Sequence, residues 1–414
     1  MIAPDRAEVM RLYKRHVSSG WARVYELMNS ALEVESSGNW ITASDGARYL
    51  DCGGYCVFLL GHAHPRVVAA VRAQLEQHAM SSRMLPHAPL AYASARLASI
   101  APEGLSYVWF GSSGAEAVEA AVKLVRAGGR KRLLSMDGGY HGKSMGALSV
   151  SGRDRYKGPF EPLLPGTERV PYGDIAALRA AMEGSDGDTA VILEPLQSEA
   201  GVIIPPSGFL RDVAEECRRH NALLVFDEIS CGMGRTGEWW CSSREGVVPD
   251  VLLAGKALSG GVVPVSAVIA SEAAFAPFNR DPLLHTSTFS GNPLACAAVM
   301  ATIDVMESEG ILERCRALGG FLLEGLRKAA AGNTVVRDVR GMGLLIGVEF
   351  AQEHHAADFI LEMMTRKVLL SHSYYGHKVA RLTPPATLTD ADAEQIIAAA
   401  ETSLRAVEAR HLKR

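Results

Sequence analysis

The sequence has no excess of basic residues and no long apolar run. Its 42 Lys and Arg residues stand against 46 Asp and Glu, a formal net charge of -4, so nucleic acid is not an expected partner. No stretch reaches the roughly 18 uninterrupted apolar residues of a membrane-spanning helix. The first 17 residues carry charges where a secretory signal needs an apolar core, so we expect a cytoplasmic protein without a membrane partner.

Cysteine is also scarce. The seven cysteines are an odd number, and several lie in apolar or glycine-rich surroundings, which predicts buried free thiols and no disulfide framework. His62 and His64 with Cys52 and Cys56 offer zinc-type ligands, but their spacing fits no common zinc pattern. We therefore predict no metal site.

The order of apolar and helical segments predicts an α/β protein. Between residues 55 and 290, short apolar runs alternate with helical stretches, which is typical of a mostly parallel sheet covered by helices on both faces. Residues 291–414 contain helical stretches and two strand candidates, a smaller α+β domain. Residues 1–54 alternate as a strand meander and are predicted to form an N-terminal segment that joins this small domain. The large domain is then 55–290.

Four of the apolar runs are followed directly by polar residues. In α/β sheets, ligands bind beyond the carboxyl ends of the strands, so these positions are candidates for a site. They are the segment GSSGAEA, Glu194, the pair Asp227 and Glu228, and Lys256. The first segment begins a helix, where free amides bind phosphate, although the same pattern is typical of an ordinary strand-to-helix turn.

A nucleotide hydrolase is the alternative from a different class. LLVFDE has the form of an acidic strand that holds Mg²⁺, and GGYHGKS superficially has the form of a phosphate loop. The loop spacing requires a glycine five positions before Gly142, where this chain has Asp137. This hypothesis therefore lacks its phosphate-binding motif.

Asp227 and Lys256 suit a pyridine-based cofactor. A carboxylate that ends a buried strand can keep a ring nitrogen protonated, which makes the ring an electron sink. A lysine near glycines in a partly desolvated pocket can form an imine with an aldehyde and later act as a base. Surface exposure is the commoner fate of a lysine.

Nine ordered segments, which cover nearly the whole chain, resemble class III aminotransferases, the ornithine and ω-amino-acid group of pyridoxal-phosphate enzymes with the aspartate-aminotransferase-like fold (fold type I). They are YLDCGGYCVFLLGHAHP, FGSSGAEAVEAAVKLVR, DGGYHGKSMGALSVSG, LEPLQSEAGVIIPP, LLVFDEISCGMGRTG, PDVLLAGKALSGG, HTSTFSGNPLACAA, RGMGLLIGVEF and RLTPP. The resemblance implies pyridoxal 5'-phosphate as cofactor and a Schiff base on Lys256.

The resemblance also implies which residues hold this cofactor. Tyr140 is expected on one face of the ring and Ile229 on the other, with Asp227 at the ring nitrogen. The other cofactor-binding residues expected are Ser113, Gly114, Ala115, His141 and Ser230. Ser287 and Thr288 are expected to reach the phosphate in the neighbouring subunit, which implies an obligate homodimer with shared active sites.

For the substrates, the resemblance implies an amine donor, a 2-oxo acid acceptor such as 2-oxoglutarate or pyruvate, and ping-pong transfer of the amino group. Arg381 is expected to bind a substrate carboxylate and otherwise to rest on Glu199. Tyr55 is expected to line the substrate tunnel. Ser230 replaces the glutamine of many members, and Lys143 replaces the arginine usual in ornithine and acetylornithine enzymes.

The segments YHGKSMGALS, PFEPLLPG and LHTSTF most resemble the putrescine (diamine) branch, so the expected donor is a diamine or an ω-amino acid. An ornithine- or acetylornithine-type enzyme, an aminotransferase of specialised metabolism and a pyridoxal-phosphate aminomutase remain alternatives.

Overall fold

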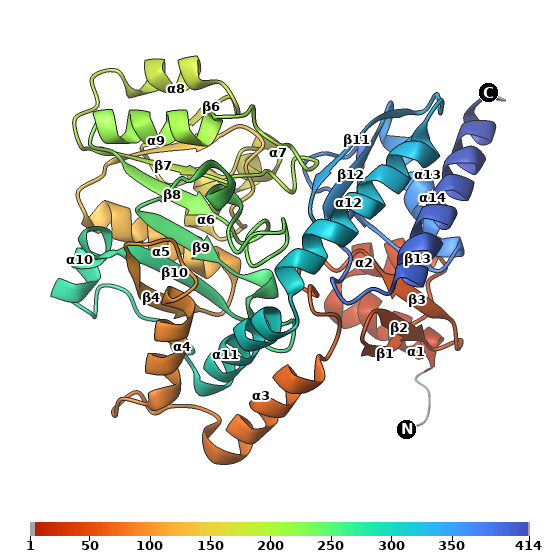
Figure 1. The fold of residues 1–414 in the computed structure, drawn as a ribbon, viewed down its shortest axis with the longest axis horizontal. Helices are drawn as coiled ribbons and strands as arrows, with labels where there is room; N and C mark the ends of the chain where they lie inside the picture. Colours follow the sequence, from red (N-terminus) through yellow and green to blue (C-terminus); the bar gives the residue numbers. More distant parts are fainter. Residues whose placement is uncertain (1–4, 413–414) are drawn as a thin grey trace.

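The computed structural model describes residues 5–412, which form three sheets with flanking helices (Figure 1). The large sheet has the strand order β4 (Leu105–Gly111), β10 (Ser266–Ser271), β9 (Val251–Ala254), β8 (Leu223–Asp227), β7 (Thr189–Leu193), β5 (Arg132–Met136) and β6 (Thr167–Val170). Only β10 runs antiparallel to its two neighbours, and the other adjacent pairs are parallel. The predicted α/β fold with a mostly parallel sheet is confirmed.

Helices cover both faces of this sheet because successive side chains of a buried strand point to opposite sides. On β8, Val225 belongs to the apolar cluster that contains α5 (Gly114–Ala127), α6 (Met145–Val150) and α10 (Glu272–Arg280). Its neighbours Leu224 and Phe226 pack with α8 (Ile175–Met182) and α9 (Phe209–Arg219) on the other face. Strands buried on both sides read as unbroken apolar runs, which is why the sequence identifies them.

Two smaller sheets lie beside the large one (Figure 1). β11 (Val336–Met342), β12 (Leu345–Phe350), β15 (Val379–Leu382) and β14 (Ser371–His372) form an antiparallel sheet. The N-terminal strands β1 (Glu33–Ser37), β2 (Trp40–Ala43) and β3 (Arg48–Asp51) form the predicted meander, and β3 pairs in parallel with β13 (Val368–Leu369). The division into residues 1–54, 55–290 and 291–414 stays a prediction.

The remaining helices connect and cover these sheets. They are α1 (Arg6–Leu12), α2 (Ser19–Leu27), α3 (Pro65–His78), α4 (Ala88–Ala98), α7 (Asp154–Lys157), α11 (Pro293–Ser308), α12 (Ile311–Ala330), α13 (Glu353–Thr365) and α14 (Asp390–His411). All seven cysteines are buried and unpaired, as predicted. Between residues 5 and 412, no helix combines the length and the apolar character needed to cross a membrane.

Candidate active site

The carboxyl ends of five strands meet at one edge of the large sheet. β4, β5, β7, β8 and β9 run in the same direction, so the residues that follow them come together. These residues are Ser113, Tyr140, His141, Glu194, Asp227 and Lys256. The four positions singled out in the sequence therefore lie at one edge. Tyr140 and His141, from the loop that follows β5, lie at the same edge.

Asp227 and His141 form a buried pair. Asp227 Oδ2 lies 2.8 Å from His141 Nδ1, and its Oδ1 accepts a hydrogen bond of 3.1 Å from the Ile229 amide. Burial alone lowers the pKa of His141, but the hydrogen bond and the charge of Asp227 outweigh it and raise the pKa of the imidazole. The other ring nitrogen, His141 Nε2, is buried without a hydrogen-bond partner.

Glu194 is a second buried carboxyl at this edge. Its Oε1 accepts a hydrogen bond of 2.8 Å from the Tyr140 amide, which fixes the loop that presents Tyr140 and His141. Burial raises the pKa of Glu194 to about 7. The negative charge of Asp227 acts in the same direction, while the positive charge of Lys256 opposes it.

Lys256 begins a short 3₁₀ turn directly after Gly255. Its backbone has a φ of 48°, in the left-handed region that lysine rarely adopts, and its side chain is half-buried. Lys256 Nζ donates a hydrogen bond to Ser230 Oγ. A lysine held in a rare backbone conformation and aimed at a buried hydroxyl is a typical feature of an active site.

The N-terminus of α5 presents free backbone amides at this edge. Ser113 caps the helix by accepting a hydrogen bond of 3.3 Å from the Glu116 amide. The amides of Gly114 and Ala115 lie in the first turn, where they have no acceptor within the helix. A Cβ added at Gly114 would lie 3.1 Å from Ile229 Cδ1, so glycine permits the close approach of Ile229 to this turn.

Within the chain, Ser287 contacts the first turn of α5. Ser287 Oγ donates a hydrogen bond of 3.0 Å to Glu116 Oε1, on the first turn of α5. Thr288 is exposed. Their predicted contact with the phosphate of a neighbouring subunit stays a prediction.

Arg381 and Glu199 form a buried ion pair. Arg381 Nη1, on β15, lies 2.6 Å from Glu199 Oε1 and 2.9 Å from Ser198 Oγ. The Nε and Nη2 atoms of Arg381 are buried without hydrogen-bond partners. Glu199 Oε2 accepts from the Tyr374 amide at 2.9 Å. The guanidinium therefore has two donors left for a further ligand.

Several aromatic rings surround this ion pair. The Tyr55 ring stacks on Tyr374 with 5.9 Å between ring centroids, and Tyr140 lies 6.2 Å from Tyr374. Lys143 Nζ lies over the rings of Tyr156 and Tyr374, at 4.8 and 5.0 Å from their centroids. Sequence reasoning missed Tyr156 and Tyr374. For Tyr374, the adjacent tyrosines of SHSYYGH were a signal that the pattern of strands and helices does not explain; Tyr156 lies in RDRYKG, which gave no signal.

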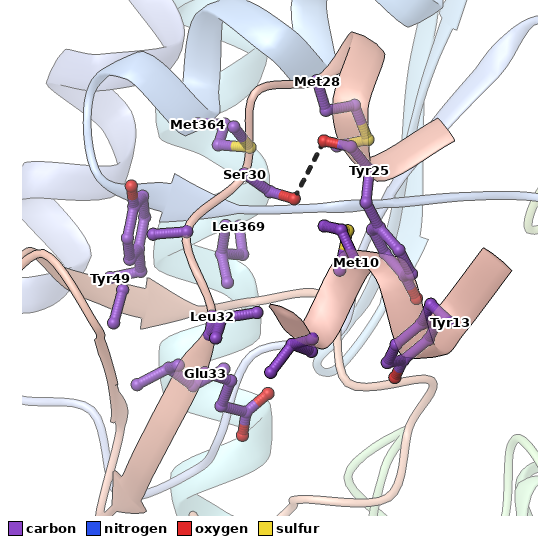
Figure 2. A pocket seen from close by; sticks show the side chains of 14 residues that line it. Met10, Tyr13, Tyr25, Met28, Ser30, Leu32, Glu33, Tyr49, Met364 and Leu369 are labelled. Carbon is purple, nitrogen blue, oxygen red and sulfur yellow. Dashed lines mark hydrogen bonds between the residues drawn. The ribbon is translucent and has the colours of Figure 1, made fainter. Parts of the chain in front are cut away.

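The zinc alternative finds no support in the geometry of the described residues. His62 Nε2 is paired with Asp51 Oδ2 at 2.8 Å, and the two histidines and two cysteines considered for zinc do not form a ligand group in the described chain. An apolar cavity of about 530 Å³ lies between the N-terminal helices, β2, β3 and the end of α13 (Figure 2). None of the predicted site residues lines it, so it is separate from the chemistry described above.

The residues at the sheet edge fit a phosphorylated pyridine aldehyde. They supply an amine (Lys256), a buried acid for a ring nitrogen (Asp227), a helix N-terminus for a phosphate and an unsatisfied imidazole nitrogen (His141 Nε2). The fold and this set of side chains define a pyridoxal-phosphate enzyme of fold type I.

The comparisons with known proteins identify the family. The family model of aminotransferase class-III matches residues 23–404, so the chain belongs to the class III aminotransferases. An ornithine aminotransferase from Toxoplasma gondii is 30% identical, with a TM-score of 0.90 over 98% of this chain and 96% of that one.

Two further solved structures are similar over almost their full lengths. A transaminase from the marine bacterium Virgibacillus is 27% identical, with a TM-score of 0.91 over 97% of this chain and 99% of that one. An (S)-enantioselective omega-transaminase from Thermomicrobium roseum is 27% identical, with a TM-score of 0.89 over 98% and 99%. The protein is therefore a pyridoxal-phosphate-dependent transaminase.

Proposed function

We propose that the enzyme transfers a terminal amino group from a diamine or an ω-amino acid to 2-oxoglutarate or pyruvate by a ping-pong mechanism. The observation that carries the proposal is the buried Arg381, whose Nε and Nη2 atoms have no partner beside the ion pair with Glu199. Two unsatisfied buried donors on a planar fork suit a carboxylate, and Glu199 neutralises the arginine when the substrate offers none.

In the proposed reaction, Lys256 Nζ would hold the cofactor until the donor amine takes its place, and the freed lysine amine would then move a proton from the carbon that bears the donor nitrogen. When bound, pyridoxal phosphate supplies an electron sink for the negative charge that develops at this carbon. Asp227 keeps a proton on the ring nitrogen, and the hydrogen bond of 2.8 Å from His141 holds the carboxylate in place. Ser230 Oγ, which accepts from Lys256 Nζ, positions the amine before the reaction.

The cofactor contacts are proposed from the same geometry. The first-turn amides of α5 at Gly114 and Ala115, with the Ser113 hydroxyl, bind the phosphate. Tyr140 and Ile229 contact opposite faces of the ring. The support is that Ile229 lies within van der Waals reach of both glycines flanking the site, since added Cβ atoms at Gly114 and Gly255 would meet it at 3.1 and 3.2 Å.

Different observations favour the two donor classes. Tyrosine faces attract cations, so the rings of Tyr55, Tyr140 and Tyr374 favour the free ammonium of a diamine while Glu199 neutralises Arg381. Lys143 Nζ places one positive charge against the rings of Tyr156 and Tyr374, which favours the carboxylate of an ω-amino acid. Lys143→Ala separates the two: it should weaken turnover of 4-aminobutyrate or β-alanine and spare that of putrescine.

We also propose a homodimer in which Ser287 and Thr288 complete the partner's phosphate site. The segment around them exposes large apolar side chains, among them Leu283 and Phe289, and so does the segment before α4, with Met84 and Leu85. Arg83 donates a hydrogen bond to the Ser287 carbonyl and joins the two segments. A second copy of the chain would cover this apolar surface. A cytoplasmic location stays a prediction.

The test of the proposed function uses the two half-reactions separately. Arg381→Lys keeps the charge but loses the fork, so it should slow the 2-oxo acid half-reaction roughly 10- to 100-fold, the equivalent of about 1.5 to 3 kcal/mol of charged hydrogen bonding. The diamine half-reaction should change much less. Single-turnover loss of the visible absorbance with donor alone measures the first half-reaction, and its recovery when the 2-oxo acid is added to the aminated enzyme measures the second. Equal reductions in the two rates would refute the proposal.

Product analysis in the same experiments separates the remaining alternatives. An aminotransferase moves one nitrogen from donor to 2-oxo acid for each turnover, whereas an aminomutase leaves it on the same carbon skeleton. A donor panel of putrescine, ornithine, acetylornithine, 4-aminobutyrate and β-alanine identifies the substrate class. An ornithine- or acetylornithine-type enzyme would show its fastest half-reaction with those two donors.

A further inference from the structure

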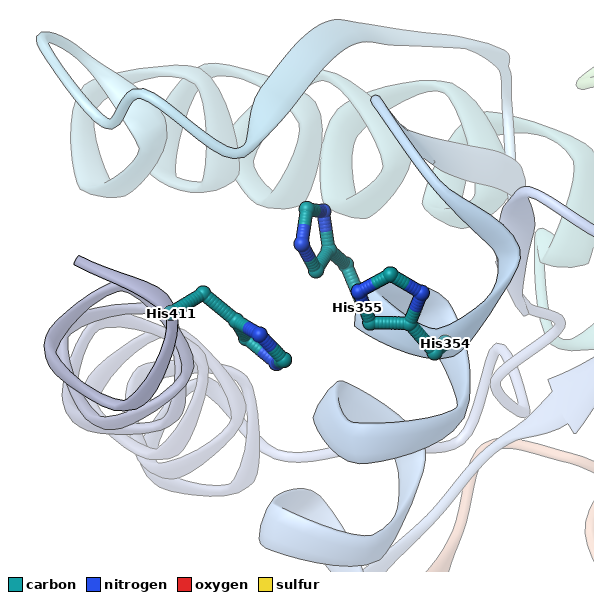
Figure 3. Close-up of side chains that lie close together, drawn as sticks. All are labelled: His354, His355 and His411. Atoms are coloured by element: carbon teal, nitrogen blue, oxygen red, sulfur yellow. The ribbon is translucent and has the colours of Figure 1, made fainter. Parts of the chain in front are cut away.

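Three histidines meet at the junction of α13 and α14, away from the proposed active site (Figure 3). His354 and His355 lie in the first turn of α13, and His411 ends α14. The ring centroids of His354 and His355 are 4.4 Å apart. The ring centroid of His411 lies 4.9 Å from that of His354 and 4.5 Å from that of His355. One nitrogen of each ring lies within 4.8 Å of the others.

This arrangement is not a consequence of helix geometry alone. Adjacent residues on a helix ordinarily point in different directions, so His354 and His355 are not expected to face a common point. Here the third imidazole comes from the other helix and closes the group. Three nitrogens at these separations need shifts of about 1 Å or more to bind one ion at the ~2.0 to 2.1 Å typical of zinc–imidazole bonds, which side-chain rotation can supply.

His355 gives the second, independent indication of a ligand. Its side chain is only 8% exposed, and its Nδ1 atom is buried without a hydrogen-bond partner. A buried polar atom without a partner costs free energy, and buried polar groups usually find one. An ion bound between the three rings would give the buried His355 imidazole a ligand.

Asp358 supports His411 from behind. Its Oδ2 lies 2.8 Å from His411 Nε2, and Arg410 Nη1 lies 3.4 Å from the same oxygen. When Nε2 donates to the carboxylate, Nδ1 keeps its lone pair for a metal, and this is the usual way in which a carboxylate orients a ligating histidine. The same carboxylate offsets part of the positive charge that an ion would add beside Arg410.

We propose that His354, His355 and His411 bind one divalent late transition-metal ion, with Zn²⁺ as the cation that fits best. Imidazole nitrogens suit Zn²⁺, Cu²⁺ and Ni²⁺, whereas Mg²⁺ and Ca²⁺ take oxygen ligands. His354 is exposed, so water completes the coordination from the solvent side. The ion links the first turn of α13 to the last turn of α14 and thereby stabilises the C-terminal helix.

The experiment uses untagged, cofactor-loaded protein. A chelator first removes bound metal, Zn²⁺ is then added, and the zinc that remains after dialysis is measured. Wild-type protein should retain one equivalent of Zn²⁺ after dialysis, by elemental analysis, and its melting temperature should rise on addition of Zn²⁺ but not of Mg²⁺. His354→Ala and His411→Ala should lose both effects. His16→Ala, at an exposed histidine on the N-terminal helical segment, should keep them.

Loss of zinc through misfolding can be distinguished from loss of a ligand in these variants. His354 is exposed, so its replacement should leave the circular dichroism spectrum and the visible absorbance of the cofactor unchanged. All seven cysteines are buried and do not compete as zinc ligands in the folded protein. Failure of the wild-type protein to retain zinc, or retention of a full equivalent by folded His354→Ala and His411→Ala proteins, would overturn the proposal.

Discussion

The individual residues of the site are tuned by burial and by one another. Asp227, His141 and Glu194 are buried at one edge of the sheet. Because little water reaches them, each of the three groups affects the pKa of its neighbours. The paired Asp227 keeps its contact with His141, while burial raises the pKa of Glu194 to about 7. Glu194 is therefore largely protonated below about pH 7.

Glu194 should make the stability of the protein fall as the pH rises. Its pKa is raised from the usual 4.5 to about 7, so the folded state binds the proton more tightly. This contribution is fully present below the unfolded pKa and is lost as the pH rises through 7, roughly 3 kcal/mol in total.

Urea unfolding of the cofactor-free protein at about pH 5 and about pH 8 measures this loss. Glu194→Gln cannot titrate, so its free energy of unfolding should decline clearly less between the two conditions. His141 titrates in both proteins, but its pKa is lower in the variant because the charge of Glu194, which raises it, is gone. The same decline in wild type and variant would show that Glu194 is not the group responsible.

At the scale of elements, the sequence predicted the strands well because they are buried on both faces. The runs at 107–110, 132–136, 190–193, 223–227 and 251–254 all became strands of the large sheet. The polar residues that follow them were correctly picked as neighbours, since parallel strands end at one edge. β6 was missed because Thr167–Val170 is short and alternates exposed with buried residues.

The loop after β5 depends on a close backbone contact that no motif displays. The Gly152 amide donates to the Gly139 carbonyl at 2.7 Å, and the Gly138 amide donates back to Gly152 at 3.3 Å. A Cβ at position 152 would overlap the backbone nitrogens of Gly138 and Gly139. This contact fixes the loop that directs His141 toward Asp227.

Gly152→Ala should therefore destabilise the protein by roughly 1 to 3 kcal/mol and weaken cofactor binding, because the loop must move. Gly158→Ala is the matched control, since nothing lies within 4 Å of an added Cβ there. Denaturant unfolding and cofactor titration measure the two effects. If both variants behave as wild type, the backbone contact does not position His141.

At the scale of the whole molecule, residues far apart in sequence build the substrate side of the site. Arg381 lies on β15 of the antiparallel sheet and Tyr374 in the loop between β14 and β15, whereas Glu199 follows β7 of the large sheet. The resemblance named Arg381 and Glu199, and the structure places them 2.6 Å apart. Tyr374 could not be predicted, because its place depends on packing between two sheets rather than on any local pattern.

The proposed shared sites predict that two inactive chains restore activity when mixed. Lys256→Ala lacks the reactive amine, and a double variant Ser287→Ala with Thr288→Ala lacks the groups offered to the partner. In a mixed dimer, one site receives both intact contributions, so about a quarter of wild-type activity should return after exchange of subunits. Activity no higher than the sum of the separate variants would exclude sharing by these residues.

The central claim is that Lys256 Nζ carries the cofactor. Borohydride reduction of the pyridoxal-phosphate-loaded enzyme converts the imine to a stable secondary amine, and peptide mass spectrometry locates it. We expect the cofactor mass on the peptide that contains Lys256, with no label and no visible absorbance in Lys256→Ala, while Lys143→Ala keeps both. A label on another lysine, or an unchanged spectrum in Lys256→Ala, would contradict the account.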